Sequence, residues 1–202
     1  MGDVGAALSY FAGEKGYMAQ TPLQSDGVLR RFDVNRLVAE KSSRYFCFAP
    51  STSLACEQVM RIVENPLLSE IANGYLGFAP HLYSINTFAT IAGESDHYVM
   101  RLHRDYDDFR ALTFFVCWTS TRADDGATLF VPGSHLRSDV DLKRLVPLAG
   151  EAGAVFAVDT FGLHAGNRAV ESFRIASWIR FGSIPNLATI QDGWLVPRVA
   201  KV

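Results

Sequence analysis

Cysteine is scarce in this sequence, and its spacing excludes the usual roles of a cysteine-rich chain. Three cysteines, Cys47, Cys56 and Cys117, are spread over 202 residues. An odd number at this spacing forms neither a disulfide framework nor a CxxC metal motif. We therefore expect buried, unpaired thiols, as in a cytoplasmic protein.

Long apolar runs and clusters of one charge are missing as well. No apolar stretch is long enough for a membrane span, and the first residues lack the basic and apolar regions of a secretory signal. The formal net charge is -2, and no run of lysines and arginines forms a basic stripe. These absences predict a cytoplasmic protein with neither a membrane nor a nucleic acid as partner. The sequence does not indicate an oligomeric state.

The composition that remains is that of one globular domain. Hydrophobic residues make up 49% of the chain and charged residues 20%, and the length suits a single domain over residues 1–202. No repeat, low-complexity tract or linker divides it. We expect an irregular and helical part over about 1–80, a β core over about 81–185 and a tail over 186–202.

Helical signals come early in the chain. The first 50 residues indicate no regular element, and residues 20–27 are a clear turn region. Apolar residues at helical spacing then predict helix over residues 51–77. Asn65 and Pro66 restart this helix as an N-cap and a first helical residue, and Gly74 or Gly77 ends it.

After Pro80 the pattern changes to short segments rich in β-branched and aromatic residues, separated by Gly, Asp and Pro. The segments are residues 81–91, 97–103, 111–121, 127–132, 153–158 and 173–182. No helix of comparable length lies between them, which favours an antiparallel sandwich or barrel. We expect a mainly β fold with the helical N-terminal third packed on its outside.

Two histidines and one aspartate are candidates for a metal site. His103 and Asp105 are two residues apart, so on an extended strand they point to the same face. His164 follows the apolar segment 153–158 and lies near the end of a strand. Two histidines with one carboxylate are the facial triad of non-haem iron(II) oxygenases, which leaves coordination positions open.

This short pattern has an alternative interpretation. An exposed acidic turn would also explain the charged residues from His103 to Arg110, and Asp107, Asp108 and Arg110 are expected to be a solvated turn in either case. His81, His97 and His135 fit surface or structural roles better than a metal site. The metal interpretation is favoured because an exposed turn would leave His164 and Arg174 unexplained.

Arg174 comes ten residues after His164 and opens the segment 173–182. On that strand one face is apolar, whereas the other carries Arg174, Trp178 and Arg180. An arginine can hold a carboxylate through two parallel hydrogen bonds. An iron triad followed by such an arginine is what a 2-oxoglutarate site requires.

Arg101 and Arg180 are expected to reach solvent at strand ends, although both could line a pocket with Trp178.

Three segments together resemble the phytanoyl-CoA dioxygenase family of iron(II)- and 2-oxoglutarate-dependent oxygenases. They are "LHRDYDDFRALTFFVCWTS", "DDGATLFVPGSH" and "DTFGLHAGNRAVESFR", in this order. The resemblance implies a double-stranded β-helix (jelly-roll) core. It also implies a small-molecule substrate, iron(II) as metal, 2-oxoglutarate as cosubstrate and dioxygen as oxidant.

The resemblance also implies roles for particular residues. His103, Asp105 and His164 would bind iron and carry the catalysis, and Arg174 would bind the far carboxylate of 2-oxoglutarate. Thr128 and Trp118 match positions that contact or adjoin the cosubstrate in relatives. Because Asp105 is present where related halogenases have a small residue, hydroxylation of an unactivated C–H bond is favoured. The alternative is a cupin-type jelly roll that binds a metal or small molecule without oxygenase activity.

Overall fold

A large antiparallel sheet forms the centre of the computed structural model. The structure describes residues 2–12, 17–19, 29–31, 45–48, 50–92, 98–106, 108–167 and 173–184. The strand order in this sheet is β2-β1-β3-β4-β10-β5-β8. The strands are β1 (Tyr17–Ala19), β2 (Leu29–Arg31), β3 (Tyr45–Phe48), β4 (His81–Ile91), β5 (Ala111–Cys117), β8 (Val155–Val158) and β10 (Phe173–Gly182). The long strand β10 therefore lies between β4 and β5, although it is the last of the described strands along the chain.

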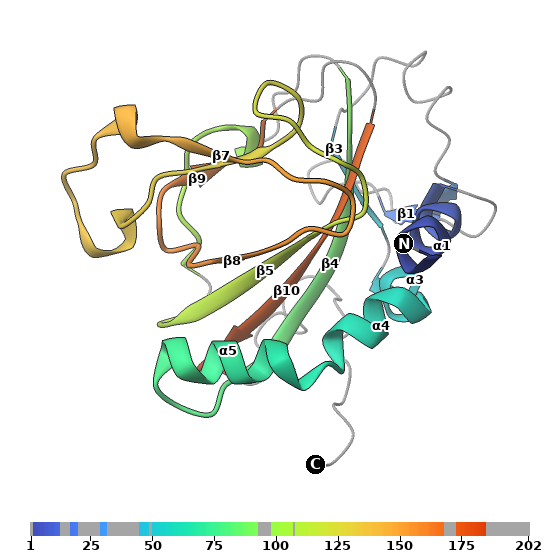
Figure 1. The fold of residues 1–202 in the computed structure, drawn as a ribbon, viewed down its shortest axis with the longest axis horizontal. Helices are drawn as coiled ribbons and strands as arrows, with labels where there is room; N and C mark the ends of the chain where they lie inside the picture. Colours follow the sequence, from blue (N-terminus) through green and yellow to red (C-terminus); the bar gives the residue numbers. More distant parts are fainter. Residues whose placement is uncertain are drawn as a thin grey trace.

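A smaller sheet, of order β7-β6-β9, lies on the other side of the large sheet from the helices (Figure 1). Its strands are β6 (Thr128–Phe130), β7 (Val146–Leu148) and β9 (His164–Ala165). Three 3-10 turns complete the core: η1 (Tyr98–Met100), η2 (Ser134–Leu136) and η3 (Leu142–Arg144). Two antiparallel sheets with helices outside are a jelly-roll arrangement, so the predicted fold class is confirmed.

The α-helices in the described part of the chain lie along one face of the large sheet (Figure 1). They are α1 (Gly2–Ala12), α3 (Pro50–Leu54), α4 (Glu57–Val63) and α5 (Pro66–Leu76). The main apolar core lies between these helices and that face of the sheet. The helix boundaries follow the local sequence. Asn65 Oδ1 accepts from Leu67 N at 3.0 Å, Pro66 begins α5, and Gly77 ends it in the left-handed conformation at φ 78°. No helix in the described ranges is long and apolar enough to cross a membrane.

Two predictions about chain segments are wrong. The first 50 residues are not without regular elements, because they hold α1 and the strands β1, β2 and β3. The segment 97–103 is not a strand: η1 turns at Tyr98–Met100, and His103 makes an isolated bridge to His164. His97 lies outside the described residues, as do 186–202. The division into parts at about residues 80 and 185 stays a prediction.

Candidate metal centre

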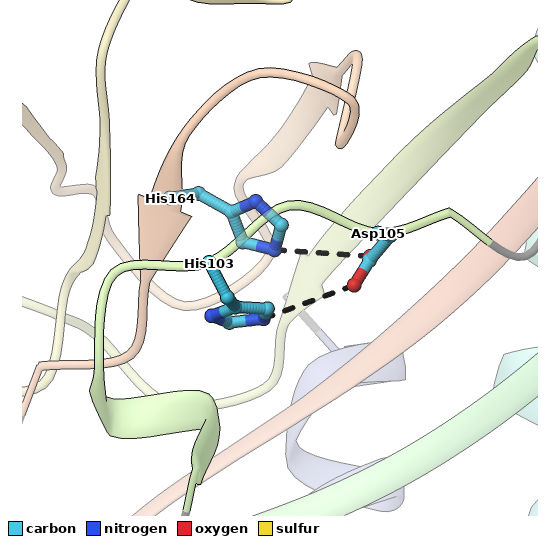
Figure 2. Close-up of side chains that lie close together, drawn as sticks. All are labelled: His103, Asp105 and His164. Carbon is cyan, nitrogen blue, oxygen red and sulfur yellow. Dashed lines mark ion pairs between the residues drawn. The ribbon is translucent and has the colours of Figure 1, made fainter.

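The side chains of His103, Asp105 and His164 come together in the structure (Figure 2). Backbone hydrogen bonds place their two loops: His103 N donates to His164 O at 2.9 Å, the reverse bond has the same length, and Asp105 N donates to Thr160 O at 2.9 Å. His103 Nε2 lies 3.8 Å from Asp105 Oδ1, and His164 Nε2 lies 3.7 Å from Asp105 Oδ2. One ligand atom from each residue lies within 4.8 Å of the others, a spacing that suits one metal ion.

Hydrogen bonds at Nδ1 orient the rings of both histidines. His103 Nδ1 lies 2.7 Å from Arg101 O, and His164 Nδ1 lies 2.9 Å from Gly162 O. A carbonyl oxygen only accepts, so each Nδ1 is the donor, and Nε2 of each ring is the nitrogen left to face a metal. Burial lowers the pKa of His164, although Asp105 and the hydrogen bond to Gly162 act in the opposite direction, and this favours the neutral ring that metals require. The donor set therefore fits iron(II).

Arg174 is a buried cation without a carboxylate beside it. Its side chain is 4% exposed, and burial lowers its pKa. Nη2 donates to Thr128 Oγ1 at 2.9 Å, and the guanidinium lies 5.2 Å from the centre of the Phe88 ring. Its Nε has no hydrogen-bond partner, and the ionisable groups that act on it are Cys117 and Tyr45 and include no described carboxylate. Because an isolated buried charge is costly, this site is built for an anion.

One pocket joins the Arg174 site to the two histidines. It is lined by His103, His164, Arg174, Thr128, Thr90, Tyr45, Phe88, Val99, Met100, Phe115, Gly166 and Trp178. Arg174 and Thr128 supply polar groups away from the metal ligands, and aromatic rings form much of the remaining wall. Sequence reasoning missed Tyr45 and Thr90, which are neighbours of Arg174 across β3, β4 and β10. The pocket, with a volume of about 20 Å³ in this structure, thus places the two histidines and a fixed cation along one cavity.

Trp118 lies elsewhere. Its side chain is 1% exposed and belongs to the core between sheet and helices, with the Phe11 ring 6.4 Å away. Its Nε1 donates to Ser177 Oγ at 2.8 Å. The structure therefore places Trp118 outside the pocket, contrary to the expectation from the resemblance. Trp178 is the tryptophan that lines the pocket.

The other arginines near the triad divide into three cases. Arg101 is exposed, as expected. Arg104 points away from the metal site and donates to the carbonyl oxygens of Ser134 and Phe161 at 2.7 and 2.5 Å. Arg180 was expected to reach solvent, but it is 8% exposed and its Nη2 lies 2.5 Å from Asp105 Oδ2. The expectation for Arg180 is wrong because β10 places its side chain against Asp105 of the metal site.

Asp108 also differs from its prediction as part of a solvated turn. It is 6% exposed, and Oδ2 accepts from the backbone N of Ser183 and Ile184 at 2.7 and 3.1 Å. Oδ1 accepts from Phe109 N and from the Ser183 hydroxyl. Asp108 therefore ties the loop after Asp105 to the end of β10. Asp107 lies outside the described residues, and Arg110 is exposed as predicted.

A jelly roll with a two-histidine, one-carboxylate site and a buried arginine in the same pocket defines the class of non-haem iron oxygenases. Comparison with known families agrees. The family model of phytanoyl-CoA dioxygenase matches residues 22–158, which is more than half of the chain. The chain belongs to the phytanoyl-CoA dioxygenase family. Its cofactors are accordingly iron(II), 2-oxoglutarate and dioxygen.

Solved structures share the fold at low sequence identity. The carbocyclase SnoK from nogalamycin biosynthesis is 18% identical with a TM-score of 0.59, and the match covers 81% of this chain and 79% of SnoK. The epimerase SnoN, in complex with Fe3+, alpha ketoglutarate and nogalamycin RO, is 18% identical with a TM-score of 0.58 over 84% of this chain and 80% of SnoN.

A further structure, EvdMO1, is 20% identical with a TM-score of 0.48, over 62% of this chain. The chain spans 32% of the length of EvdMO1, about a third. No curated protein matches this sequence.

Proposed function

We propose that this chain is an iron(II)- and 2-oxoglutarate-dependent dioxygenase that hydroxylates an unactivated C–H bond of a small-molecule metabolite or natural-product intermediate. One observation carries the proposal. A single pocket joins the two histidines of the triad to Arg174, a buried guanidinium that no described carboxylate neutralises. A keto acid that reaches the metal and carries a second carboxylate would satisfy both ends.

The residues of the chain have separate tasks in this proposal. His103, Asp105 and His164 hold the metal, and the carbonyls of Arg101 and Gly162 fix the two rings. Bound iron(II) supplies oxidising chemistry with dioxygen as 2-oxoglutarate is converted to succinate and carbon dioxide.

The cosubstrate is proposed to be held at the other end of the pocket. Arg174 binds its far carboxylate, and Thr128 holds the guanidinium in place. The rings of Phe88, Phe115 and Trp178 keep water out of the pocket.

Two features bear on the reaction type. Asp105 occupies the place that a halogenase would leave free for chloride, which favours oxidation by hydroxylation. SnoN and SnoK are described as an epimerase and a carbocyclase, so the products of turnover must be identified. A cupin-type binding protein would have no use for Arg174, and its buried, unpaired charge speaks against that alternative.

Succinate release tests the proposal. The protein is supplied with iron(II), 2-oxoglutarate and air, and succinate is measured with and without a panel of small natural-product precursors. We expect slow succinate release alone, faster release with a substrate, and product heavier by one oxygen atom. His164→Ala should abolish release, and His81→Ala, at an exposed histidine outside the pocket, should not. Absence of succinate from the unsubstituted protein would contradict the proposal.

A further inference from the structure

Arg180 is a buried arginine that the metal site does not require as a ligand. It lies on β10, in register with Ser84 of β4 and Thr113 of β5, so its backbone is fixed in the middle of the large sheet. Its side chain is 10% exposed. A cation so far from water needs an anionic partner. Among the described residues, the carboxylate of the metal triad is such a partner.

The contact between these two side chains is specific to one oxygen. Arg180 Nη2 donates to Asp105 Oδ2 at 2.5 Å. The Trp178 ring lies 5.1 Å from the Arg180 guanidinium carbon and limits where the guanidinium can move. Oδ1 accepts no hydrogen bond from the described residues and lies 3.8 Å from His103 Nε2, whereas Oδ2 lies 3.7 Å from His164 Nε2. Each carboxylate oxygen therefore faces a ligand histidine, and the two differ in the hydrogen bond that Oδ2 accepts from Arg180.

This difference has a consequence for metal binding. An oxygen engaged by a guanidinium is a poorer donor to a cation, because the positive charge already draws on its lone pairs. A carboxylate that bound through both oxygens would use one more coordination position of the metal. A bidentate keto acid and dioxygen together need three positions, which is what a triad with a one-oxygen carboxylate leaves open.

We propose that Arg180 is a positioning residue that restricts Asp105 to a single metal-binding oxygen, Oδ1, and so keeps a position open for 2-oxoglutarate. The inference rests on the proposed function, since it concerns the same site. It differs from a merely structural role, in which Arg180 would neutralise Asp105 without affecting how the carboxylate binds. In that case its removal would change stability but not the number of open positions.

Mn(II) is a suitable probe because it is paramagnetic and its coordinated waters can be counted. The experiment loads the full chain with Mn(II) without air and counts the inner-sphere waters by water-proton relaxation and by EPR in oxygen-17 water. The unsubstituted protein should hold three, one for each position that the triad leaves open in an octahedral site. Two waters would mean that both Asp105 oxygens bind, and would overturn the inference without any variant.

The variants test Arg180 itself. Arg180→Gln should hold one inner-sphere water fewer and bind 2-oxoglutarate about tenfold more weakly, with no loss of Mn(II) affinity. Arg180→Lys, which keeps the charge and one donor, should regain the parent water number. Arg144→Gln, at an exposed arginine of η3, should match the parent throughout. Thermal melting of each variant monitors its folding.

The outcomes separate the two proposals. An unchanged water number in Arg180→Gln, or proportional losses of Mn(II) affinity and 2-oxoglutarate affinity, would overturn the positioning role and leave the proposed function intact. If the unsubstituted protein bound Mn(II) but not 2-oxoglutarate, the proposed function would fail first, and the inference with it.

Discussion

The two faces of β10 are both buried, but for different reasons. The face toward the helices carries Ile175, Ser177 and Ile179, each 0% exposed, and both isoleucines belong to the main apolar core. The opposite face carries Arg174 and Arg180, which are 4% and 8% exposed. Burial on the first face stabilises the fold by removing apolar area from water. On the second face it opposes folding, because two guanidinium groups lose their hydration.

The two buried arginines on the second face differ in whether a carboxylate of the protein compensates their charge. Arg180 has a carboxylate partner, Asp105, so its charge is compensated within the protein. Arg174 has a hydroxyl partner, Thr128, and an aromatic neighbour, Phe88, which leave its charge uncompensated. A site that is destabilising without its ligand is typical of function rather than of packing. A substitution on the first face should therefore change stability, and loss of Arg174 on the second face should change binding.

Arg174→Leu should give the largest effect on binding. Removal of the cation that holds the far carboxylate should weaken 2-oxoglutarate binding by about 100-fold or more. The metal-free protein should be as stable as the parent or more stable, because an uncompensated buried charge is gone. Binding is measured by anaerobic titration and stability by thermal melting. A melting temperature several degrees lower, with binding retained, would make Arg174 a structural residue.

Ile179→Ala should show the reverse pattern. The side chain is 0% exposed and packs in the core under the helices, so truncation should lower the free energy of unfolding by about 2–5 kcal/mol. The folded fraction should bind 2-oxoglutarate as tightly as the parent. Urea unfolding followed by circular dichroism gives the first quantity. A loss of affinity without a loss of stability would remove the distinction between the faces.

Asp108→Ala tests the clamp between the metal loop and the end of β10. Loss of this buried acceptor leaves the N–H groups of Phe109, Ser183 and Ile184 without their partner, which should lower the free energy of unfolding by about 1–3 kcal/mol. Urea unfolding measures the change, and Asp139→Ala, at an exposed aspartate, serves as control. Equal stabilities for the two variants would restore the interpretation of Asp108 as a solvated turn.

Trp118→Phe, a substitution in the core between the sheet and the helices, should have the smallest effect. The indole N–H donor to Ser177 is lost, but Ser177 keeps the hydroxyl of Thr87 as partner at 2.7 Å. The cost should be about 1 kcal/mol, and 2-oxoglutarate affinity should not change. A tenfold weaker affinity would place Trp118 at the cosubstrate after all.

The triad and Arg174 could be predicted because their signals are local and ordered along the chain. His103 and Asp105 are two residues apart, and His164 and Arg174 lie at the edges of apolar segments. The alternating face of residues 173–182 was visible for the same reason, since a strand alternates with a period of two.

The features that could not be predicted from the sequence depend on long-range contacts. All seven residues of β5 are buried, so no alternation indicates the side on which the following Trp118 lies. Asp108 reads as part of a charged turn, because its partner Ser183 is 75 residues away. Strands β1 and β2 have three residues each; β2 pairs with β1, and β1 pairs with β3, which no local pattern reveals.

The most direct test of the central claim is an anaerobic titration of the iron(II)-loaded protein with 2-oxoglutarate, followed by visible absorption. The chelate should give a weak metal-to-ligand charge-transfer band that saturates, and His103→Ala and His164→Ala should abolish it. Arg174→Leu should shift the titration to higher 2-oxoglutarate concentration without removing the band. No band at any concentration in the unsubstituted protein would contradict the account and favour a jelly roll that binds a metal without this chemistry.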